Sequence, residues 1–100
     1  MFGLDVACLP ARYGNFHCIN QDSVICRSIR KYGEWAQIEI EILSALIDND
    51  GIILDIGANI GTHAVGFATL NPQSTVIALE PQPLAYALLS ANILSAGTAN

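Results

Sequence analysis

The run Ile52-Ile53-Leu54-Asp55-Ile56-Gly57-Ala58-Asn59-Ile60-Gly61 decides the fold expected of this 100-residue chain. Its first five residues form an apolar stretch interrupted only by Asp55, and two glycines follow within a short loop. A short apolar run bounded by turn residues is typical of a strand buried on both faces of a parallel sheet. We therefore predict a buried strand over 52–56 and a loop over 57–61 at its carboxyl end.

The residues after this loop predict a second strand and two helices. Residues 62–70 are expected to form a helix that ends before Asn71-Pro72, and 75–79 a second buried strand. A last helix is expected from Pro83 to about Ser95, with Gly97 as its stop. Strand, helix, strand, helix is a βαβα unit, for which a right-handed crossover and a parallel sheet are expected. The predicted fold class is α/β, Rossmann-like, with helices flanking the sheet.

The N-terminal third predicts a smaller element ahead of this sheet. Aromatic and β-branched residues over 12–30 flank the polar cluster Asn20-Gln21-Asp22-Ser23, which is typical of a β-hairpin with a four-residue turn. We expect residues 1–33 to form an N-terminal extension carrying this hairpin. Residues 34–100 are expected to be only the N-terminal part of the Rossmann-like domain, because the chain stops where the next strand should begin.

A helix is expected at the start of the second part, from Glu34 to the turn at Asp48-Asn49-Asp50-Gly51. Glu39 and Glu41 are expected on its solvated side. Its core-facing stripe is predicted from apolar residues at helical spacing, namely Trp35, Ile38, Ile42, Ala45 and Leu46.

The charge distribution limits the possible partners. The net charge is -5, and all four basic residues lie within the first 31 positions. Nucleic acid is therefore not an expected partner, because phosphate binding needs a clustered basic face. The small basic cluster is interpreted as solvated surface. No apolar run approaches the roughly 18 to 20 residues of a membrane helix, and the start lacks the basic residues of a signal peptide, so we expect a cytoplasmic protein without a membrane span.

The cysteines predict no special chemistry. Cys8, Cys18 and Cys26 are odd in number and lack the CxxC spacing of metal sites. We expect neither a disulfide framework nor a bound metal, and interpret all three as small buried side chains.

Two places at the carboxyl edge of the predicted sheet are candidate ligand contacts. Gly57 and Gly61 leave the backbone open to close approach, and the helix that follows presents free N–H groups to a ligand carboxylate. Glu80 follows the second strand, 25 positions after Asp55, where nucleotide-binding folds place a carboxylate for ribose hydroxyls.

The glycine spacing favours one cofactor over another. A dinucleotide fingerprint requires G-x-G-x-x-G, but this loop has Asn59 and Thr62 at two of the glycine positions. A Gly-x-Asn-x-Gly loop suits a nucleoside with a small charged tail, which describes S-adenosylmethionine better than a dinucleotide. A carboxylate at Glu80 would also repel a 2'-phosphate.

Several motifs together resemble one enzyme family. The loop from Ile53 to His63, the run Ala78-Leu79-Glu80-Pro81-Gln82-Pro83, and Asn92 are similar to the FkbM family of methyltransferases. Upstream, the same resemblance is carried by Arg12-Tyr13-Gly14, Asp22, Tyr32-Gly33-Glu34-Trp35 and Glu39. The resemblance covers residues 12–100.

The resemblance implies a class I, S-adenosylmethionine-dependent methyltransferase that methylates a hydroxyl of a sugar, glycolipid or secondary metabolite. It implies that Asp55 orders the loop at the strand end and that Glu80 holds the ribose. The implied cofactor-binding residues are Tyr32, Glu34, Asp55, Gly57, Ala58, Asn59, Gly61, Glu80 and Pro81. No catalytic base is implied within these residues. The expected partner is a small-molecule or glycan methyl acceptor.

Other interpretations remain open. The same fold could serve an NAD-type nucleotide-binding oxidoreductase, or a non-catalytic cofactor-binding or scaffolding module. The two loop glycines could merely permit tight packing, and His17, His63 and Asn92 are interpreted as structural residues. Unpaired edges of a two-strand sheet also make a homo-oligomer possible.

Overall fold

The four elements predicted after residue 51 are present in the computed structural model, which describes residues 5–21, 24–48 and 50–100. They are β3 (Ile52–Ile56), α3 (Thr62–Leu70), β4 (Thr75–Leu79) and α4 (Pro83–Ala96). The two strands pair in parallel, with Ile52 opposite Thr75 and Ile56 opposite Leu79. The expectation of an α/β chain with a parallel strand pair is confirmed.

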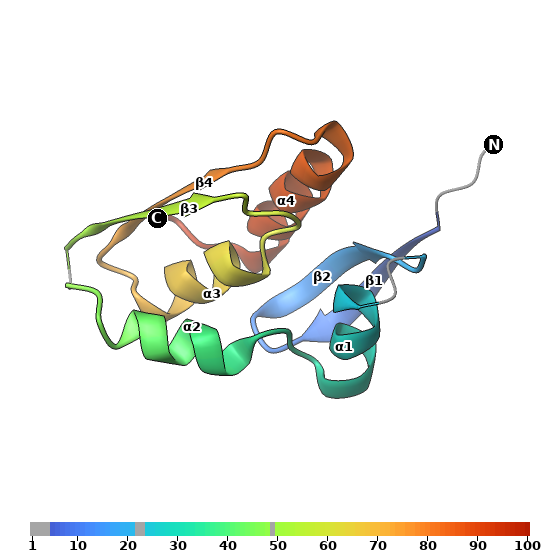
Figure 1. The fold of residues 1–100 in the computed structure, drawn as a ribbon, viewed down its shortest axis with the longest axis horizontal. Helices are drawn as coiled ribbons and strands as arrows, with labels where there is room; N and C mark the ends of the chain where they lie inside the picture. The colour runs from blue at the N-terminus through green and yellow to red at the C-terminus, as the bar shows by residue number, and fades with distance from the viewer. Residues whose placement is uncertain (1–4, 22–23, 49) are drawn as a thin grey trace.

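Only one face of this strand pair is covered. Figure 1 shows β3 and β4 as the upper layer, with α3 beneath them. Leu89 of α4 packs with Val76 and Ala78 on the covered face. On the other face Leu54 is 58% exposed and Ile56 is 77% exposed.

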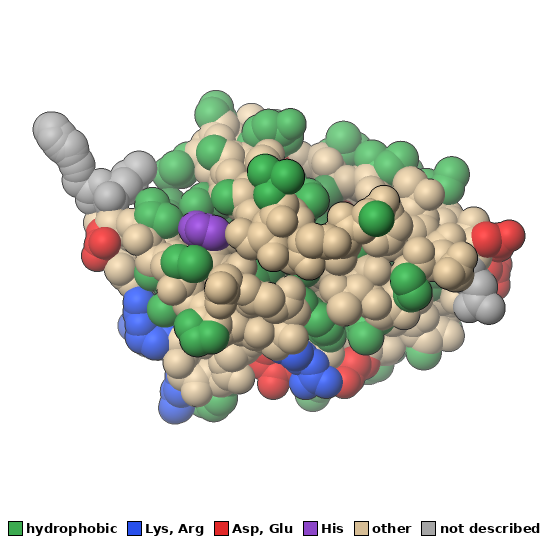
Figure 2. Space-filling model, turned by 180° about the vertical axis from the view of Figure 1, so that it is seen from behind, with side chains coloured by type: hydrophobic (Ala, Val, Ile, Leu, Met, Phe, Trp, Pro, Cys, Tyr) green, Lys and Arg blue, Asp and Glu red, His purple; other side chains and the backbone are tan. Residues whose placement is uncertain are grey.

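The expectation that both strands are buried on both faces is therefore wrong for the described residues. An apolar run is compatible with two-sided burial, but burial also requires a second layer. No described element lies over the second face, and hydrophobic side chains emerge along the upper margin in Figure 2.

The N-terminal hairpin exists but begins and turns earlier than predicted. Strands β1 (Val6–Ala11) and β2 (Gly14–Ile19) pair antiparallel, and the chain turns between them at Arg12-Tyr13. Gly14 has φ +114°, a value that glycine adopts readily.

The segment expected to follow the predicted turn Asn20-Gln21-Asp22-Ser23 is a helix, and Asp22 and Ser23 themselves lie outside the described residues. This helix, α1 (Ile25–Tyr32), replaces the second strand expected there. Cys26 and Ile29 are both buried on its inner side, where they pack with Phe16 of the hairpin. Burial of one helical face has thus overridden the β-branched character of the segment.

The cysteine expectation also requires correction. Cys18 of β2 and Cys26 of α1 form a disulfide, and Cys8 is exposed rather than buried. The packing of α1 on the hairpin places the two Cα atoms 5.5 Å apart, within the range that a disulfide spans. A separation of eight residues carries no signal for this pairing, because only the tertiary arrangement brings the two side chains together.

Helix α2 (Gln37–Ser44) is shorter than predicted and buries a different face. It starts after Ala36, whose φ of 56° is left-handed, and it ends before the expected turn. Gln37 and Ile40 are its buried residues, whereas Ile38 of the predicted stripe is 74% exposed.

Isoleucines stand at alternate positions in this helix, so the sequence does not indicate which helical face is buried. The packing of α2 on α3 resolves the ambiguity, because Ile40 lies against Gly66, where an added Cβ would be 2.9 Å from Ile40 Cγ2. Trp35, which was also predicted in the stripe, precedes the helix and is only partly buried.

The hairpin and the parallel unit share one hydrophobic core. Phe16 and Ile29 of the N-terminal part pack with Ile60, Val65 and Leu88 of the remainder. The expected boundary between residues 33 and 34 therefore runs through a common core. Within the residues that the structure describes, no helix is long and apolar enough to cross a membrane.

Candidate functional site

The loop after β3 lies against the end of β4. The backbone N–H groups of Gly57 and Ala58 both donate to the carbonyl oxygen of Leu79, each at 2.9 Å. The N–H of Asn59 donates to Glu80 Oε1 at 2.8 Å, and that of Gln82 donates to Glu80 Oε2 at 3.0 Å. The structure thus brings together the two places that the sequence selected, 21 residues apart, at one edge of the sheet.

Glu80 retains capacity for further hydrogen bonds. Each oxygen of an ionised carboxylate offers about two acceptor positions, and each Glu80 oxygen uses one for a backbone N–H. Two neighbouring hydroxyl donors, such as those of a ribose, could therefore still bind without displacing the loop.

The two loop glycines serve different purposes. Gly57 has φ +78°, and a Cβ placed there would have no atom within 4 Å, so the space beside it is open. Gly61 has φ +95° and is buried, and a Cβ there would lie 2.7 Å from Leu89 Cδ1. The missing side chain of Gly61 therefore permits packing of the loop against α4, whereas that of Gly57 leaves room at the surface.

The other residues predicted to contact a cofactor here are also either buried in the core or exposed at the surface. Ala58 is buried and packs with Ala64 and Leu89, so its side chain belongs to the core. Asn59 and Pro81 are exposed, and Asn59 has a left-handed φ of 54°. Asparagine tolerates this conformation better than most residues do, which explains its presence in the loop.

Helix α3 begins directly after the loop. Gly61 is its N-cap and makes no side-chain capping bond, and the first helical hydrogen bond joins the N–H of Val65 to the Gly61 carbonyl. The earlier N–H groups of such a turn have no partner within the helix and favour an anion.

Asp55 lies at the end of β3 with an unsatisfied oxygen. Its Oδ2 atom is buried and has no hydrogen-bond partner among the described residues. Burial raises the pKa of this carboxyl above its ordinary value, and the nearby His63 lowers it to a smaller extent. For Oδ2, the loop-ordering contact expected of Asp55 is not present, and Glu80 holds the loop instead.

His63 makes a contact with a distant residue that the sequence did not indicate. Its Nε2 atom lies 3.0 Å from Glu39 Oε1, which joins the first turn of α3 to α2. Histidine and glutamate are 24 residues apart, so no spacing rule could have paired them. The placement of Glu39 in the motif segment was the only available signal.

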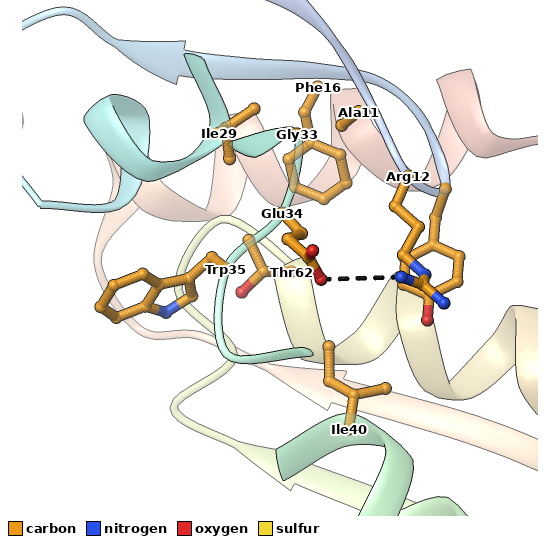
Figure 3. Close-up of a pocket in the computed structure, with 10 residues that line it drawn as sticks. Ala11, Arg12, Phe16, Ile29, Gly33, Glu34, Trp35, Ile40 and Thr62 are labelled. Atoms are coloured by element: carbon orange, nitrogen blue, oxygen red, sulfur yellow. Dashed lines mark ion pairs between the residues drawn. The ribbon is translucent and has the colours of Figure 1, made fainter. Parts of the chain in front are cut away.

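A small hollow with room for about 20 Å³ lies beside the start of α3 (Figure 3). Glu34, Trp35 and Thr62 line it together with Arg12, whose Nη1 atom is 3.7 Å from Glu34 Oε2. That Glu34 oxygen is buried and accepts no hydrogen bond from a described residue. Glu34 and Thr62 therefore line the same hollow, and the predicted role of Glu34 near the methionine end of a cofactor stays a prediction.

Tyr32 does not accompany Glu34 into this hollow. It is exposed on the surface of α1, and Lys31 Nζ lies 5.0 Å from the centre of its ring. Its predicted contact with a cofactor stays a prediction.

Asn92 connects the hairpin to the loop over residues 57–61. It is fully buried on α4, and its Nδ2 group donates to the carbonyl oxygens of Ile60 at 2.7 Å and His17 at 3.0 Å. Its Oδ1 atom accepts from the backbone N–H of His17 at 2.6 Å. These bonds agree with the interpretation of Asn92 and His17 as structural residues. Through the Ile60 carbonyl they also hold the loop against α4 and the hairpin.

No protein-family model, curated protein or solved structure matches the chain. Among the described residues, no three histidine, cysteine or acidic side chains are grouped closely enough to hold a metal ion.

Proposed function

We propose that this chain binds S-adenosylmethionine and belongs to a class I, Rossmann-like methyltransferase of the kind that the FkbM-like motifs imply. The observation that carries the proposal is the contact between the loop and Glu80, where Asn59 N–H donates to Glu80 Oε1 at 2.8 Å. A loop and a carboxylate joined at the carboxyl ends of adjacent parallel strands are the arrangement that such folds use for a nucleoside.

The residues present fit this cofactor. Open space beside Gly57 allows a ligand to approach the backbone, and Glu80 has acceptor capacity for two ribose hydroxyls. The unsatisfied Oδ2 of Asp55 calls for a hydrogen-bond donor, which an ammonium group supplies. The first turn of α3 suits a carboxylate, so an amino-acid tail meets complementary charges here.

When bound, S-adenosylmethionine would supply a methyl group on a positively charged sulfur. The contribution of this chain is to hold and orient the donor so that an acceptor oxygen can approach in line while water is excluded. We propose the hydroxyl of a sugar, glycolipid or secondary metabolite as acceptor. We assign no catalytic base.

The dinucleotide alternative is less well supported by the same loop. Asn59 and Thr62 replace fingerprint glycines, and Thr62 is the first residue of α3, where a pyrophosphate would need close approach. The non-catalytic alternative shares the cofactor but not turnover, so it requires a separate assay.

Isothermal titration of the chain with S-adenosylhomocysteine and, separately, with NAD tests the proposal. We expect binding of S-adenosylhomocysteine and none of NAD. Binding of NAD alone would contradict the proposal in favour of an oxidoreductase domain. Methyl transfer to candidate sugars in the presence of S-adenosylmethionine separates an enzyme from a non-catalytic binding module.

The cellular location is part of the proposal and meets one opposing observation. We propose the cytoplasm, but disulfides such as Cys18–Cys26 persist mainly in oxidising compartments. Counting free thiols in protein isolated without reductant addresses this conflict. One reactive thiol, that of Cys8, indicates that the disulfide forms, whereas three indicate a reduced protein.

A further inference from the structure

A groove with basic and aromatic walls runs along α1, away from the cofactor loop. It is open to solvent and has room for about 350 Å³, and its walls include Arg27, Lys31, Tyr32 and Trp35. Basic side chains gather at the end of the molecule that carries α1, at the lower left in Figure 2. The chain as a whole is acidic, with a net charge of -5, so this groove is an electrostatic exception.

The four basic residues of the chain are not equivalent. Arg12 faces Glu34 and Glu41 at 3.7 and 3.5 Å, and Arg30 donates to the side chain of Asn20. Arg27 and Lys31 have no acidic partner among the described residues, although Lys31 lies over the Tyr32 ring.

Arg27 and Lys31 are also placed to act together. They are four positions apart on one helix, a spacing that puts two side chains on the same face, about 5 to 6 Å apart at Cβ. Both line the groove. A single phosphate or carboxylate could therefore contact both cations.

We propose that this groove binds the phosphate or carboxylate of a small molecule whose ring or apolar part rests on Tyr32 and Trp35. The cations supply charge-assisted hydrogen bonds to the anion, and the aromatic rings supply flat apolar surface for the body of the ligand.

The number of cations excludes larger anionic partners. Attraction to an anionic membrane is worth about 1 kcal/mol per basic residue, so two residues on an acidic protein provide too little. Nucleic-acid binding likewise draws on roughly 6 to 10 phosphate contacts in well-studied proteins. A small ligand needs only one anionic group, which the two cations can contact together.

The groove and the hollow that contains Glu34 and Thr62 share one lining residue, Trp35. Resting on the proposed function, the groove ligand is the methyl acceptor, held by its anionic end while its hydroxyl lies toward the start of α3. The acceptor class is then an anionic sugar or a related ring compound.

The test is a two-dimensional NMR titration of the isotope-labelled chain with glucose 6-phosphate, glucuronate, inorganic phosphate and glucose. We expect amide shifts over α1 and Trp35 with the two anionic sugars, and none with glucose. Glucose 6-phosphate against glucuronate identifies phosphate or carboxylate as the preferred anion. Inorganic phosphate alone is expected to bind more weakly, because it lacks the ring.

Arg27→Gln and Lys31→Gln are each expected to weaken the preferred ligand about tenfold. Arg30→Gln is the matched control, since it removes the same charge from the same helix but leaves the groove intact. Equal losses in all three variants, or no shifts with any anion, would overturn the proposal. Binding to phosphatidylserine vesicles in place of the sugars would also overturn it.

Titration of each variant with S-adenosylhomocysteine keeps the two proposals separate. Loss of the groove ligand with cofactor binding retained tests the groove alone. Failure of the wild-type chain to bind S-adenosylhomocysteine would reject the cofactor and the acceptor assignment, and would leave the groove to be judged by the NMR shifts.

Discussion

Two carboxylates stand at the carboxyl ends of the neighbouring strands β3 and β4, and their surroundings differ sharply. Glu80 accepts a backbone N–H at each oxygen and holds the loop over residues 57–61. Asp55 has a buried oxygen without a partner, and burial raises its pKa. A satisfied carboxylate contributes to the fold before any ligand arrives, whereas an unsatisfied one costs folding free energy that a ligand can recover.

The largest expected effect comes from removing the satisfied carboxylate. Glu80→Ala deletes the acceptor for Asn59 N–H and the proposed ribose contact. Hydrogen bonds to charged groups are worth about 1.5–3 kcal/mol, so S-adenosylhomocysteine affinity should fall about 100-fold by isothermal titration. Glu41→Ala is the control, because it removes the same charge at the exposed pair with Arg12. If both variants bind alike, Glu80 has no specific role.

Replacing the unsatisfied carboxylate should affect stability and binding in opposite directions. Asp55→Asn removes a poorly solvated charge at neutral pH, so the free energy of unfolding in urea should increase. Cofactor affinity should fall about tenfold, because the ammonium of the ligand loses its partner. Glu80→Gln should lower both quantities. A decrease of stability in Asp55→Asn would remove the distinction between the two carboxylates.

The pH dependence of stability should show the same difference. A folded-state pKa raised above the ordinary value of 3.8 means that the folded chain holds the Asp55 proton more tightly than the unfolded chain. The stability that Asp55 contributes is therefore fully present below pH 3.8 and is lost as pH rises through the raised pKa. Urea unfolding of wild type and Asp55→Asn over this range should show a difference that grows with pH. A constant difference would contradict the shift.

The smallest effect concerns the charge that partly offsets this shift. His63 lowers the pKa of Asp55, though less than burial raises it. In His63→Gln that pKa should rise further, so the pH window should move upward in the same unfolding measurement. Glu39→Ala breaks the contact with His63 but keeps the histidine, and serves as control. An equal movement in both variants would assign the effect to the α2–α3 contact instead.

Prediction from sequence succeeded where local signals agreed. The predicted bounds 52–56, 62–70 and 75–79 coincide with β3, α3 and β4, and the last helix differs by about one residue. Each of these elements has an apolar run, a turn signal and a stop residue that point to the same boundary. The placement of the loop and Glu80 at one edge of the sheet followed from the rule that ligands bind beyond the carboxyl ends of parallel strands, whereas the hydrogen bond between them was not predicted.

Prediction from sequence failed where the local pattern of a segment fitted two structures equally well. The segment 25–32 has the β-branched residues of a strand and the inward-facing pair of a helix, and packing on the hairpin selected the helix. In α2, isoleucines on more than one face left two possible phases, and contact with Gly66 chose Ile40. The Cys18–Cys26 bond and the His63–Glu39 contact join residues from different elements, which spacing does not reveal.

The sequence by itself determined the βαβα order, the open glycine loop and a carboxylate after the second strand, because these depend on residues close together in the chain. The tertiary structure decided that Gly61 serves packing, that Glu80 rather than Asp55 holds the loop, and that one sheet face is uncovered. Each of these depends on which atoms from distant segments share a small volume. Short-range periodicity carries no information about that arrangement.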